Sequence, residues 1–248
     1  MGKFVTFVSA MLLISGLSAL QAQTVDDIIN NYVDALGGKD KLNSIKTLYM
    51  EGVTVMQNGN EITAKVYKEQ NKLSRREVSF GMGSSTTIVT DKEGWFSNPR
   101  NGGAFEAIPA ERLKAQQAEL DITSPLVNYA AKGNTAELLG KEKVGETEAY
   151  KIKLTSKTGN EIIYYIDPKT WYLIRETRKG GAGMPGGGGR PGGQNSGDGT
   201  VNIDYSNYQK TPEGYVFPYT VSFGFGGSMN YEKIDVNKPI DVKLYKPG

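Results

Sequence analysis

The clearest structural signal in this chain lies near its middle, in YKIKLTSKTGNEIIYYIDPKTWYLIRETR, residues 150–178. Over 150–154, three apolar side chains alternate with two lysines, the period-two pattern of a β-strand with one buried face. Two more short strand-like runs follow, at 161–167 and 171–178, each after turn-forming residues. This spacing leaves no room for a crossover helix, so it predicts antiparallel strands rather than β-α-β units.

The same pattern extends over most of the chain. A tight hairpin turn is expected at Asn58-Gly59, between two of the runs. The sequence predicts roughly ten strands, and a sheet that long tends to curl, which hides its exposed edges. Outside the middle stretch, the runs cover 48–53, 62–66, 73–80, 85–90, 94–97, 201–209, 215–225, 229–234 and 242–245.

Three segments carry a helical pattern instead. In 24–36, apolar residues recur at i, i+3, i+4 and i+7, Thr24 is placed to cap the N-terminus, and a glycine pair follows the end. Segments 109–118 and 124–132 begin beside prolines, which helices accept in their first turn. We therefore predict a mainly β (α+β) fold, in which a curled antiparallel sheet forms an incomplete barrel and the helices cover its concave face.

The glycine-rich stretch GGAGMPGGGGRPGGQNSGDG, residues 180–199, has three interpretations. Residues 181–186 spell G-x-G-x-x-G, but a dinucleotide-binding loop needs a helix after it, and the following glycines and proline cannot form one. A domain linker is disfavoured because alternating strands flank the stretch on both sides. We predict a flexible hairpin loop that the fold does not need. A loop ordered by a partner is the alternative.

Residues 1–22 have the features of a secretory signal peptide. A basic start is followed by an apolar run too short to cross a bilayer, and Ala22 precedes the expected cleavage site. A buried N-terminal helix is the alternative. The sequence has no cysteine, so it can carry neither disulfides nor a lipid on an N-terminal cysteine. We expect an exported, soluble protein without a lipid anchor, folded as one domain over 23–248.

Composition limits the chemistry that is available. The chain has 29 Lys and Arg against 27 Asp and Glu, and this near-neutral balance argues against nucleic-acid binding. Histidine is absent as well as cysteine, which excludes Ser-His-Asp and Cys-His catalysis and ordinary zinc sites. No pair of carboxylates stands out, so a carboxylate hydrolase is the weakest hypothesis. We expect no catalytic residue, no cofactor and no metal.

Several stretches of the sequence resemble the outer-membrane lipoprotein-sorting (LolA-like) carrier family, in the divergent form common in Bacteroidetes-type bacteria. One of them is similar to the helical lid of that family, IPAERLKAQQ (108–117), and another to the divergent members, DALGGKDKLNSIKTL (34–48). The others are DKEGWFSNP (91–99), YYIDPKTWYLIRET (164–177), YSNYQKTPEGYVFPYTVSF (205–223) and NKPIDVKLYKP (237–247).

This resemblance implies a half-open barrel whose apolar concave face, under a helical lid, holds the acyl chains of a lipid or lipoprotein. Such a carrier works in the periplasm as a monomer, between membrane-bound donor and acceptor proteins. Family carriers place an arginine on an early strand, where it latches the lid. The corresponding stretch here, 66–72, offers only Lys68, which lacks the bidentate donor fork of arginine. The sequence therefore departs from the family at the latch.

Large apolar residues at alternate strand positions are the candidates for the lining of such a pocket. In a closed sheet the same side chains would fill the core, whereas in a half-open sheet they line a ligand site, and both interpretations stay open. The candidates on the sheet are Met50, Ile62, Val66, Val89, Trp95, Phe96, Tyr164, Ile166 and Trp171, and those beneath the lid are Leu113, Leu126, Val127 and Tyr129.

Two polar features have competing interpretations. Asp167-Pro168-Lys169-Thr170 invites a catalytic interpretation, but Asp-Pro followed by polar residues is more simply a turn. Arg75-Arg76 is expected on a solvated face, with contact to lipid headgroups as the alternative.

Two functions follow from the sequence. The first is a non-enzymatic carrier of acyl chains for outer-membrane sorting. The alternative is an envelope protein on the same scaffold with a filled core, which binds a protein partner through its surface or through 180–199. A large apolar cavity would separate the first from the second.

Overall fold

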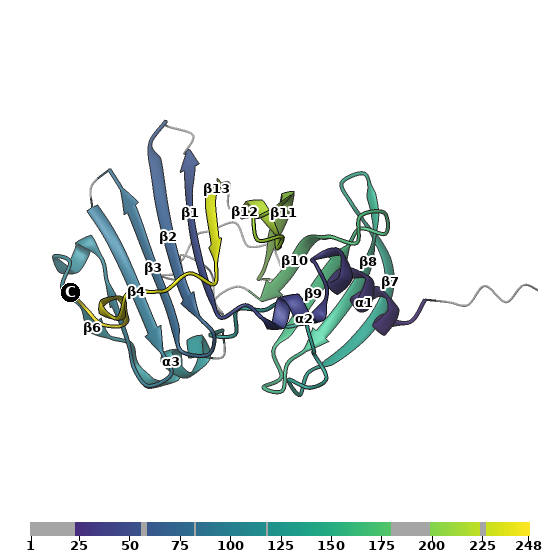
Figure 1. Ribbon diagram of the computed structural model, residues 1–248, viewed down its shortest axis with the longest axis horizontal. Helices are drawn as coiled ribbons and strands as arrows, with labels where there is room; N and C mark the ends of the chain where they lie inside the picture. The colour runs from purple at the N-terminus through teal and green to yellow at the C-terminus, as the bar shows by residue number, and fades with distance from the viewer. Residues whose placement is uncertain (1–22, 56–58, 82, 118, 180–198, 224–226) are drawn as a thin grey trace, which may run out of the picture.

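A single antiparallel sheet dominates the computed structural model of the protein (Figure 1). Thirteen strands make up this sheet within the described residues, and the helices there are few and short. The predicted signal peptide, most of the predicted loop (180–198) and Asn58 of the predicted hairpin turn lie outside the described residues. The structure describes residues 23–55, 59–81, 83–117, 119–179, 199–223 and 227–248.

The chain builds this sheet from two meanders that meet in its middle. Strands β1 to β6 follow one another outward from the centre, and β7 to β13 return inward from the opposite edge, so that β1 pairs with β13. In spatial order the strands are β6 (Glu106–Ala107), β5 (Gly94–Ser97), β4 (Gly83–Thr90), β3 (Leu73–Phe80), β2 (Glu61–Glu69), β1 (Thr47–Val55), β13 (Gly227–Val236), β12 (Val216–Phe223), β11 (Thr200–Lys210), β10 (Leu173–Lys179), β9 (Glu161–Ile166), β8 (Thr147–Thr155) and β7 (Thr135–Val144).

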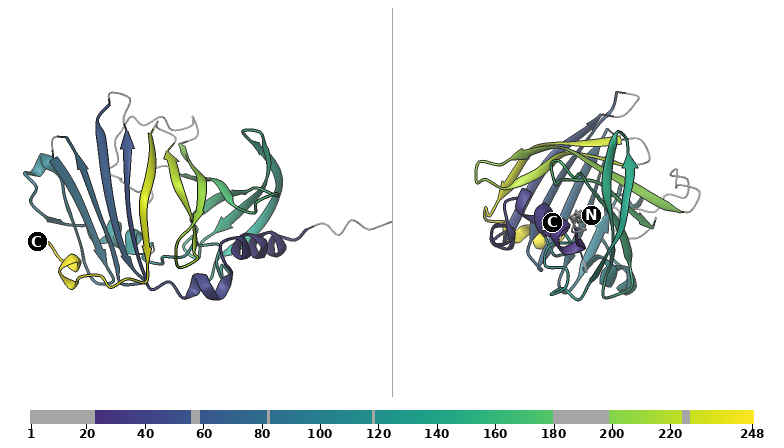
Figure 2. Two further views of the ribbon diagram at one scale, coloured as in Figure 1. Left: turned by 45° about the horizontal axis from the view of Figure 1, so that its top comes forward. Right: turned by 90° about the vertical axis from the view of Figure 1, so that its right-hand side faces the viewer.

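The sheet is open and is less curled than the incomplete barrel that we expected. Its edge strands, β6 and β7, do not pair with each other in the described structure. Because β6 has only two residues, it offers few backbone groups with which to close the sheet. Strand direction changes gradually from β4 to β8, which is the twist typical of long sheets (Figure 2).

A register shift interrupts the pairing of the first and last strands. It lies between Glu51 and Gly52, where β1 pairs with β13. A Cβ added to Gly52 would lie 2.6 Å from the carbonyl oxygen of Asn230, closer than two such atoms can approach. Glycine at this position therefore allows the backbone of β13 to pass.

Most of the predicted strands are confirmed, with three differences. The two edge strands, β6 and β7, were not predicted. The expected last strand, 242–245, is instead the 3₁₀-helix η2 (Val242–Tyr245), which Asp241 caps by accepting the N–H of Lys243. Trp171 belongs to the turn before β10 rather than to the strand, because its φ of 60° is incompatible with extended backbone.

Helix α1 (Val25–Ala35) forms where the sequence predicts it. Thr24 Oγ1 accepts the N–H of Asp27 at 3.2 Å, and the Asp27 carboxylate accepts the N–H of Thr24 at 2.9 Å, which together make a capping box. The two glycines after the helix have positive φ and end it, and α2 (Lys39–Asn43) follows. Within the described residues, no helix has the length and hydropathy needed to cross a membrane.

Of the other two predicted helices, only one exists. α3 (Ala110–Gln117) confirms the first, and the 3₁₀-helix η1 (Pro99–Asn101) precedes it. The helix predicted over 124–132 is wrong, since this segment consists of turns. Asn128 has a φ of 55°, a left-handed conformation that interrupts a right-handed helix.

Apolar side chains on one face of the sheet, called here the inner face, form two clusters. The larger cluster lies under α1 and α2, and the smaller one lies beside α3, so the helices occupy this same face. The smaller cluster contains Val89, Ile108 and Leu120, with Phe96 and Leu113 packed against them. Its larger counterpart contains Ile28, Ile29, Tyr32, Val33, Leu36, Leu42, Ile45, Leu48, Leu126, Val127, Ile152, Leu154, Tyr164, Ile166, Leu173, Tyr215, Ile234 and Val236.

Candidate ligand-binding site

Between the two clusters, the inner face of β1, β2 and β3 carries five large apolar side chains that are only partly buried. The strand register places Met50 opposite Val66, and Ile62 opposite Phe80, while Val78 lies on the same face of β3. Each of these five side chains is intermediate in exposure rather than buried. We call them the apolar strip. It is a part of the inner face that the helices and the two clusters cover only partly.

Seven of the predicted lining residues lie in or against the larger cluster. Four of them are at most 1% exposed, so they fill the core beneath α1 rather than line a space. The four are Leu126, Val127, Tyr164 and Ile166, and the three packed against the cluster are Met50, Tyr129 and Trp171.

The remaining predicted residues are divided among three places. Trp95 lies on the outer face, opposite Ile88, because consecutive strand residues point to opposite sides of a sheet. The smaller cluster holds Val89, Phe96 and Leu113, and the apolar strip holds Ile62 and Val66.

Val78 and Phe80, the two β3 residues of the apolar strip, were not among the predicted lining residues. They lie two residues apart on one strand, and this spacing is the signal that marks a shared face.

The connection from β6 to β7, residues 108–134, joins opposite edges of the sheet and therefore has to cross one of its faces. It crosses the inner face, since Leu113 packs in the smaller cluster and Leu126 in the larger one. At the end of α3, Gln117 Nε2 donates to the carbonyl of Thr90 in β4 at 2.8 Å. This crossing segment occupies the place expected for a lid.

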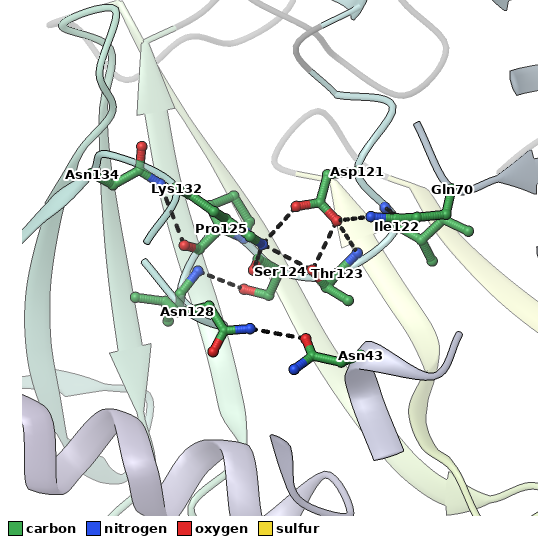
Figure 3. A network of polar contacts seen from close by, with 11 residues as sticks. Asn43, Gln70, Asp121, Ile122, Thr123, Ser124, Pro125, Asn128, Lys132 and Asn134 are labelled. Carbon is green, nitrogen blue, oxygen red and sulfur yellow. Dashed lines mark hydrogen bonds and ion pairs between the residues drawn. The ribbon is translucent and has the colours of Figure 1, made fainter. Parts of the chain in front are cut away.

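Figure 3 shows the polar network that holds the crossing segment to the turn between β2 and β3. Gln70 Nε2 donates to Asp121 Oδ1 at 2.9 Å, and Gln70 Oε1 accepts the N–H of Ile122 at 2.8 Å. Lys132 Nζ lies 2.6 Å from Asp121 Oδ2 and donates to Thr123 Oγ1 at 2.8 Å. Burial opposes the charge of Asp121, but the hydrogen bonds from Lys132 and Gln70 outweigh it, so the pKa of Asp121 lies below its ordinary value.

The far side of the crossing segment is fixed to the helices. Tyr129 donates from its hydroxyl to Asp26 of α1 at 2.6 Å, and this hydrogen bond raises the pKa of Tyr129. Asn128 Nδ2 donates to Asn43 Oδ1 of α2 at 2.9 Å (Figure 3). The segment is therefore tied at both sides, and opening it requires breaking one of these sets of bonds.

Lys68, the residue that the sequence offers in place of the family's latch arginine, does not latch the crossing segment. Gln70, two residues further on, makes the hydrogen bonds instead. The side chain of Lys68 lies on the inner face, on the β2 position opposite Ser74. Burial lowers its pKa.

Charged side chains of β10 also face inward. Glu176 is 3% exposed, and its Oε1 lies 2.7 Å from Arg178 Nη2. Arg178 Nη1 in turn lies 3.7 Å from Glu119 Oε1 of the crossing segment. Beside them is a groove of about 310 Å³, lined by Glu119, Gly159, Asn160, Glu161, Ile162, Arg178 and Lys179.

The Asp-Pro sequence is a turn, as predicted. Asp167 Oδ1 accepts the N–H of Lys169 and Oδ2 accepts the hydroxyl of Thr170, both at 2.9 Å. These bonds occupy both oxygens of the carboxylate. Across the described residues, no group of three or more acidic side chains is arranged to hold a metal ion.

The two neighbouring arginines do not form one surface cluster. Arg75 lies on the outer face, where its Nε donates to Glu77 at 2.7 Å and its Nη1 donates to the Leu244 carbonyl at 3.2 Å. It therefore holds the C-terminal segment on β3. Arg76 lies on the inner face, opposite Val66.

Solved structures share this fold over most of their length. A LolA superfamily protein from Nitrosomonas europaea is 12% identical, with a TM-score of 0.54 over 91% of this chain and 99% of that one. A DUF1329 family protein from Desulfovibrio piger is 12% identical, with a TM-score of 0.56 over 90% of this chain and 98% of that one. A putative outer membrane lipoprotein-sorting protein domain from Vibrio parahaemolyticus is 10% identical, with a TM-score of 0.50 over 88% of this chain and 94% of that one. No protein-family model matches the sequence, and neither does any curated protein. The likeness is one of fold.

Proposed function

We propose that this protein is a non-enzymatic carrier that holds the acyl chains of a lipid or lipoprotein on the apolar strip. The observation that carries this proposal is the incomplete burial of the strip between two well-packed clusters. Each CH₂ removed from water contributes about 0.8 kcal/mol, so a chain of ten carbons gains about 8 kcal/mol if it is fully covered. A strip of five apolar residues beside a tied segment supports such burial.

The fold likeness supports the same function. Two of the similar structures are described as a LolA superfamily protein and a lipoprotein-sorting protein domain. In this proposal, residues 1–22 direct export, and 23–248 act as a single-domain monomer in the periplasm. Cargo arrives from a membrane-bound donor and leaves to an acceptor for outer-membrane sorting.

Loading needs a route to the apolar strip, and the crossing segment is the element that has to move. Near Asp121 it is held by the hydrogen bonds to Gln70 and Asn71 and by Leu120 in the smaller cluster, whereas its apolar contacts beneath α1 are more extensive. We therefore expect the end near Asp121 to open while the end near Leu126 stays packed.

A second function is favoured by the filled core beneath α1. Leu126, Val127, Tyr164 and Ile166 are at most 1% exposed there. An envelope protein that binds a protein partner through its surface, without lipid cargo, would have such a core.

Native mass spectrometry of residues 23–248, purified without detergent from a bacterial periplasm, tests the proposal. Acylated species that co-purify at close to one per protein, and are identified after solvent extraction, are the expected result. A clean unliganded mass, together with no uptake of a fluorescent fatty acid, would overturn the carrier and leave the interaction protein.

A further inference from the structure

Three cationic side chains meet in the middle of the inner face. Lys68 on β2 and Arg76 on β3 are diagonal neighbours on that face, since Lys68 pairs with Ser74 and Arg76 with Val66. Arg178 reaches the same region from β10. Burial is the main cause of the lowered pKa of Lys68, and attraction by Glu119 and Asp121 partly opposes it. Repulsion from Arg178 and Arg76 lowers the pKa further, so all three cations lie near one another.

Two of these cations lack a partner. Across the described residues, Lys68 and Arg76 have neither a hydrogen bond nor an ion pair, and the buried Nε of Arg76 has no acceptor. The buried Nε of Arg178 is also without an acceptor, although its Nη atoms contact Glu176 and Glu119. Buried polar atoms are nearly always hydrogen-bonded in folded proteins, so this group of donors indicates a missing acceptor.

The carboxylates nearby do not supply that acceptor. Asp121 is occupied by Lys132 and Gln70. Glu176 and Glu119 both contact Arg178, and in the described structure neither makes an ion pair with Lys68 or Arg76. Glu176 Oε1 is buried beside Arg178 Nη2 and makes no hydrogen bond to the other two cations there.

Cations on the outer face of the same two strands are paired, which makes the inner pair unusual. Lys65 Nζ lies 3.4 Å from Glu51 Oε1, and Arg75 Nε lies 2.7 Å from Glu77 Oε1. The lack of partners is therefore a property of the inner face and not of these strands in general.

Apolar side chains of the strip lie next to the unpaired cations, beside the polar Ser74 and Thr87. Arg76 lies directly opposite Val66 and between Ser74 and Val78 on its own face of β3, and Lys68 follows Val66 on β2. A ligand that satisfies this site has to combine an anionic group with an apolar chain. An arginine and a lysine side by side suit a carboxylate or a phosphate, which accept several charge-assisted hydrogen bonds.

We propose that Lys68 and Arg76, supported by Arg178, bind the anionic headgroup of an amphiphile whose alkyl chain lies on the apolar strip. This inference rests on the proposed function for the place of the chain. It adds that the cargo is anionic, with a carboxylate or phosphate at its head.

The test compares binding of dansyl-undecanoic acid with that of its methyl ester, which keeps the chain and removes the charge. The unmodified protein is expected to bind the acid about tenfold more tightly, the minimum for one charge-assisted hydrogen bond. The double variant Lys68→Gln with Arg76→Gln is expected to bind both probes equally. The matched control, Lys65→Gln with Arg75→Gln, removes two cations from the outer face of the same strands and is expected to keep the preference.

Four outcomes separate the possibilities. Competition by inorganic phosphate against the acid, but not against the ester, supports the site. Equal binding of acid and ester to the unmodified protein overturns the headgroup site and leaves the carrier standing, and this comparison needs no variant to fold. Failure to bind either probe overturns both proposals. If inorganic phosphate alone binds as tightly as the acid, the alkyl chain contributes nothing to the affinity. The ligand of the site is then a free anion, and the proposal of an anionic amphiphile is overturned.

Discussion

Gln70 and Asp121 join two parts of the molecule that are distant in the sequence, with Gln70 Nε2 donating to Asp121 Oδ1 at 2.9 Å. The amide of Gln70 also accepts the N–H of Ile122, so a single side chain makes two bonds from the β2–β3 turn to the crossing segment (Figure 3). A third comes from the backbone, where the N–H of Asn71 donates to the carbonyl of Leu120 at 3.1 Å. These hydrogen bonds hold the crossing segment against the turn, and in the proposed carrier they would have to break when the segment opens.

Replacing Gln70 by Ala is expected to loosen the crossing segment without unfolding the sheet. Loss of a bond to a charged carboxylate and one to a backbone N–H lowers the free energy of unfolding by about 1–3 kcal/mol. Amide hydrogen exchange over 120–134 should quicken, and uptake of a fluorescent fatty acid should be faster in stopped-flow measurements. Gln209→Ala, which removes an exposed hydrogen bond to Asn207, serves as the control. It should change neither the amide exchange over 120–134 nor the rate of fatty-acid uptake. Unchanged exchange in the Gln70→Ala protein would contradict the latch.

Acid should weaken the same network through Asp121. The pKa of this carboxyl is lower in the folded protein than its ordinary value of 3.8, so its contribution to stability is present above that value. The contribution is lost as pH falls through the lower, folded pKa. Denaturant titrations below about pH 4 should therefore show a steeper loss of stability in the unmodified protein than in Asp121→Asn. Parallel pH profiles for the two proteins would assign the acid sensitivity to other carboxylates.

The strands and α1 could be predicted because their signals are local. Alternation marks the strands, and Thr24 with Asp27 marks the start of α1. The turn at Asp167 could be predicted for the same reason. The segment after Pro125 could not, because the left-handed backbone of Asn128 depends on tertiary contacts such as its bond to Asn43.

The candidate site was less predictable, because alternation divides a strand into two faces without saying which one is inner. Trp95 and Phe96 are neighbours, so only one of them can face the ligand. The inward position of Glu176 depends on pairing across β9 and β11, including the register shift after Leu173. The sequence of β10 alone does not show how it pairs with the neighbouring strands, so this position could not be predicted from a local pattern.

The unpaired cations should make stability and binding change in opposite directions. Burial lowers the pKa of Lys68, so its charge destabilises the folded protein below that lowered pKa. Lys68→Met is expected to raise the free energy of unfolding at neutral pH, on the order of 1 kcal/mol, while the preference for an acid over its ester is lost. The gain should shrink as pH rises toward 10.5, where lysine loses its proton in the unfolded chain as well. Thermal unfolding at several pH values measures this, and a less stable Lys68→Met protein would indicate that Lys68 has a structural role instead.

Two apolar substitutions separate the core from the binding surface. Leu126 is 0% exposed, so Leu126→Ala should lower the free energy of unfolding by about 2–5 kcal/mol and leave the affinity of the folded protein for a fatty acid unchanged. Val66 is only partly buried on the apolar strip, so Val66→Ala should cost less stability. It should nevertheless weaken binding by about threefold to tenfold, because the lost methyl groups would have covered the alkyl chain. Denaturant titration and fluorescence binding on the same samples give both quantities. If Leu126→Ala weakens binding and Val66→Ala does not, the ligand lies beneath α1, and the apolar strip is only an incompletely covered surface.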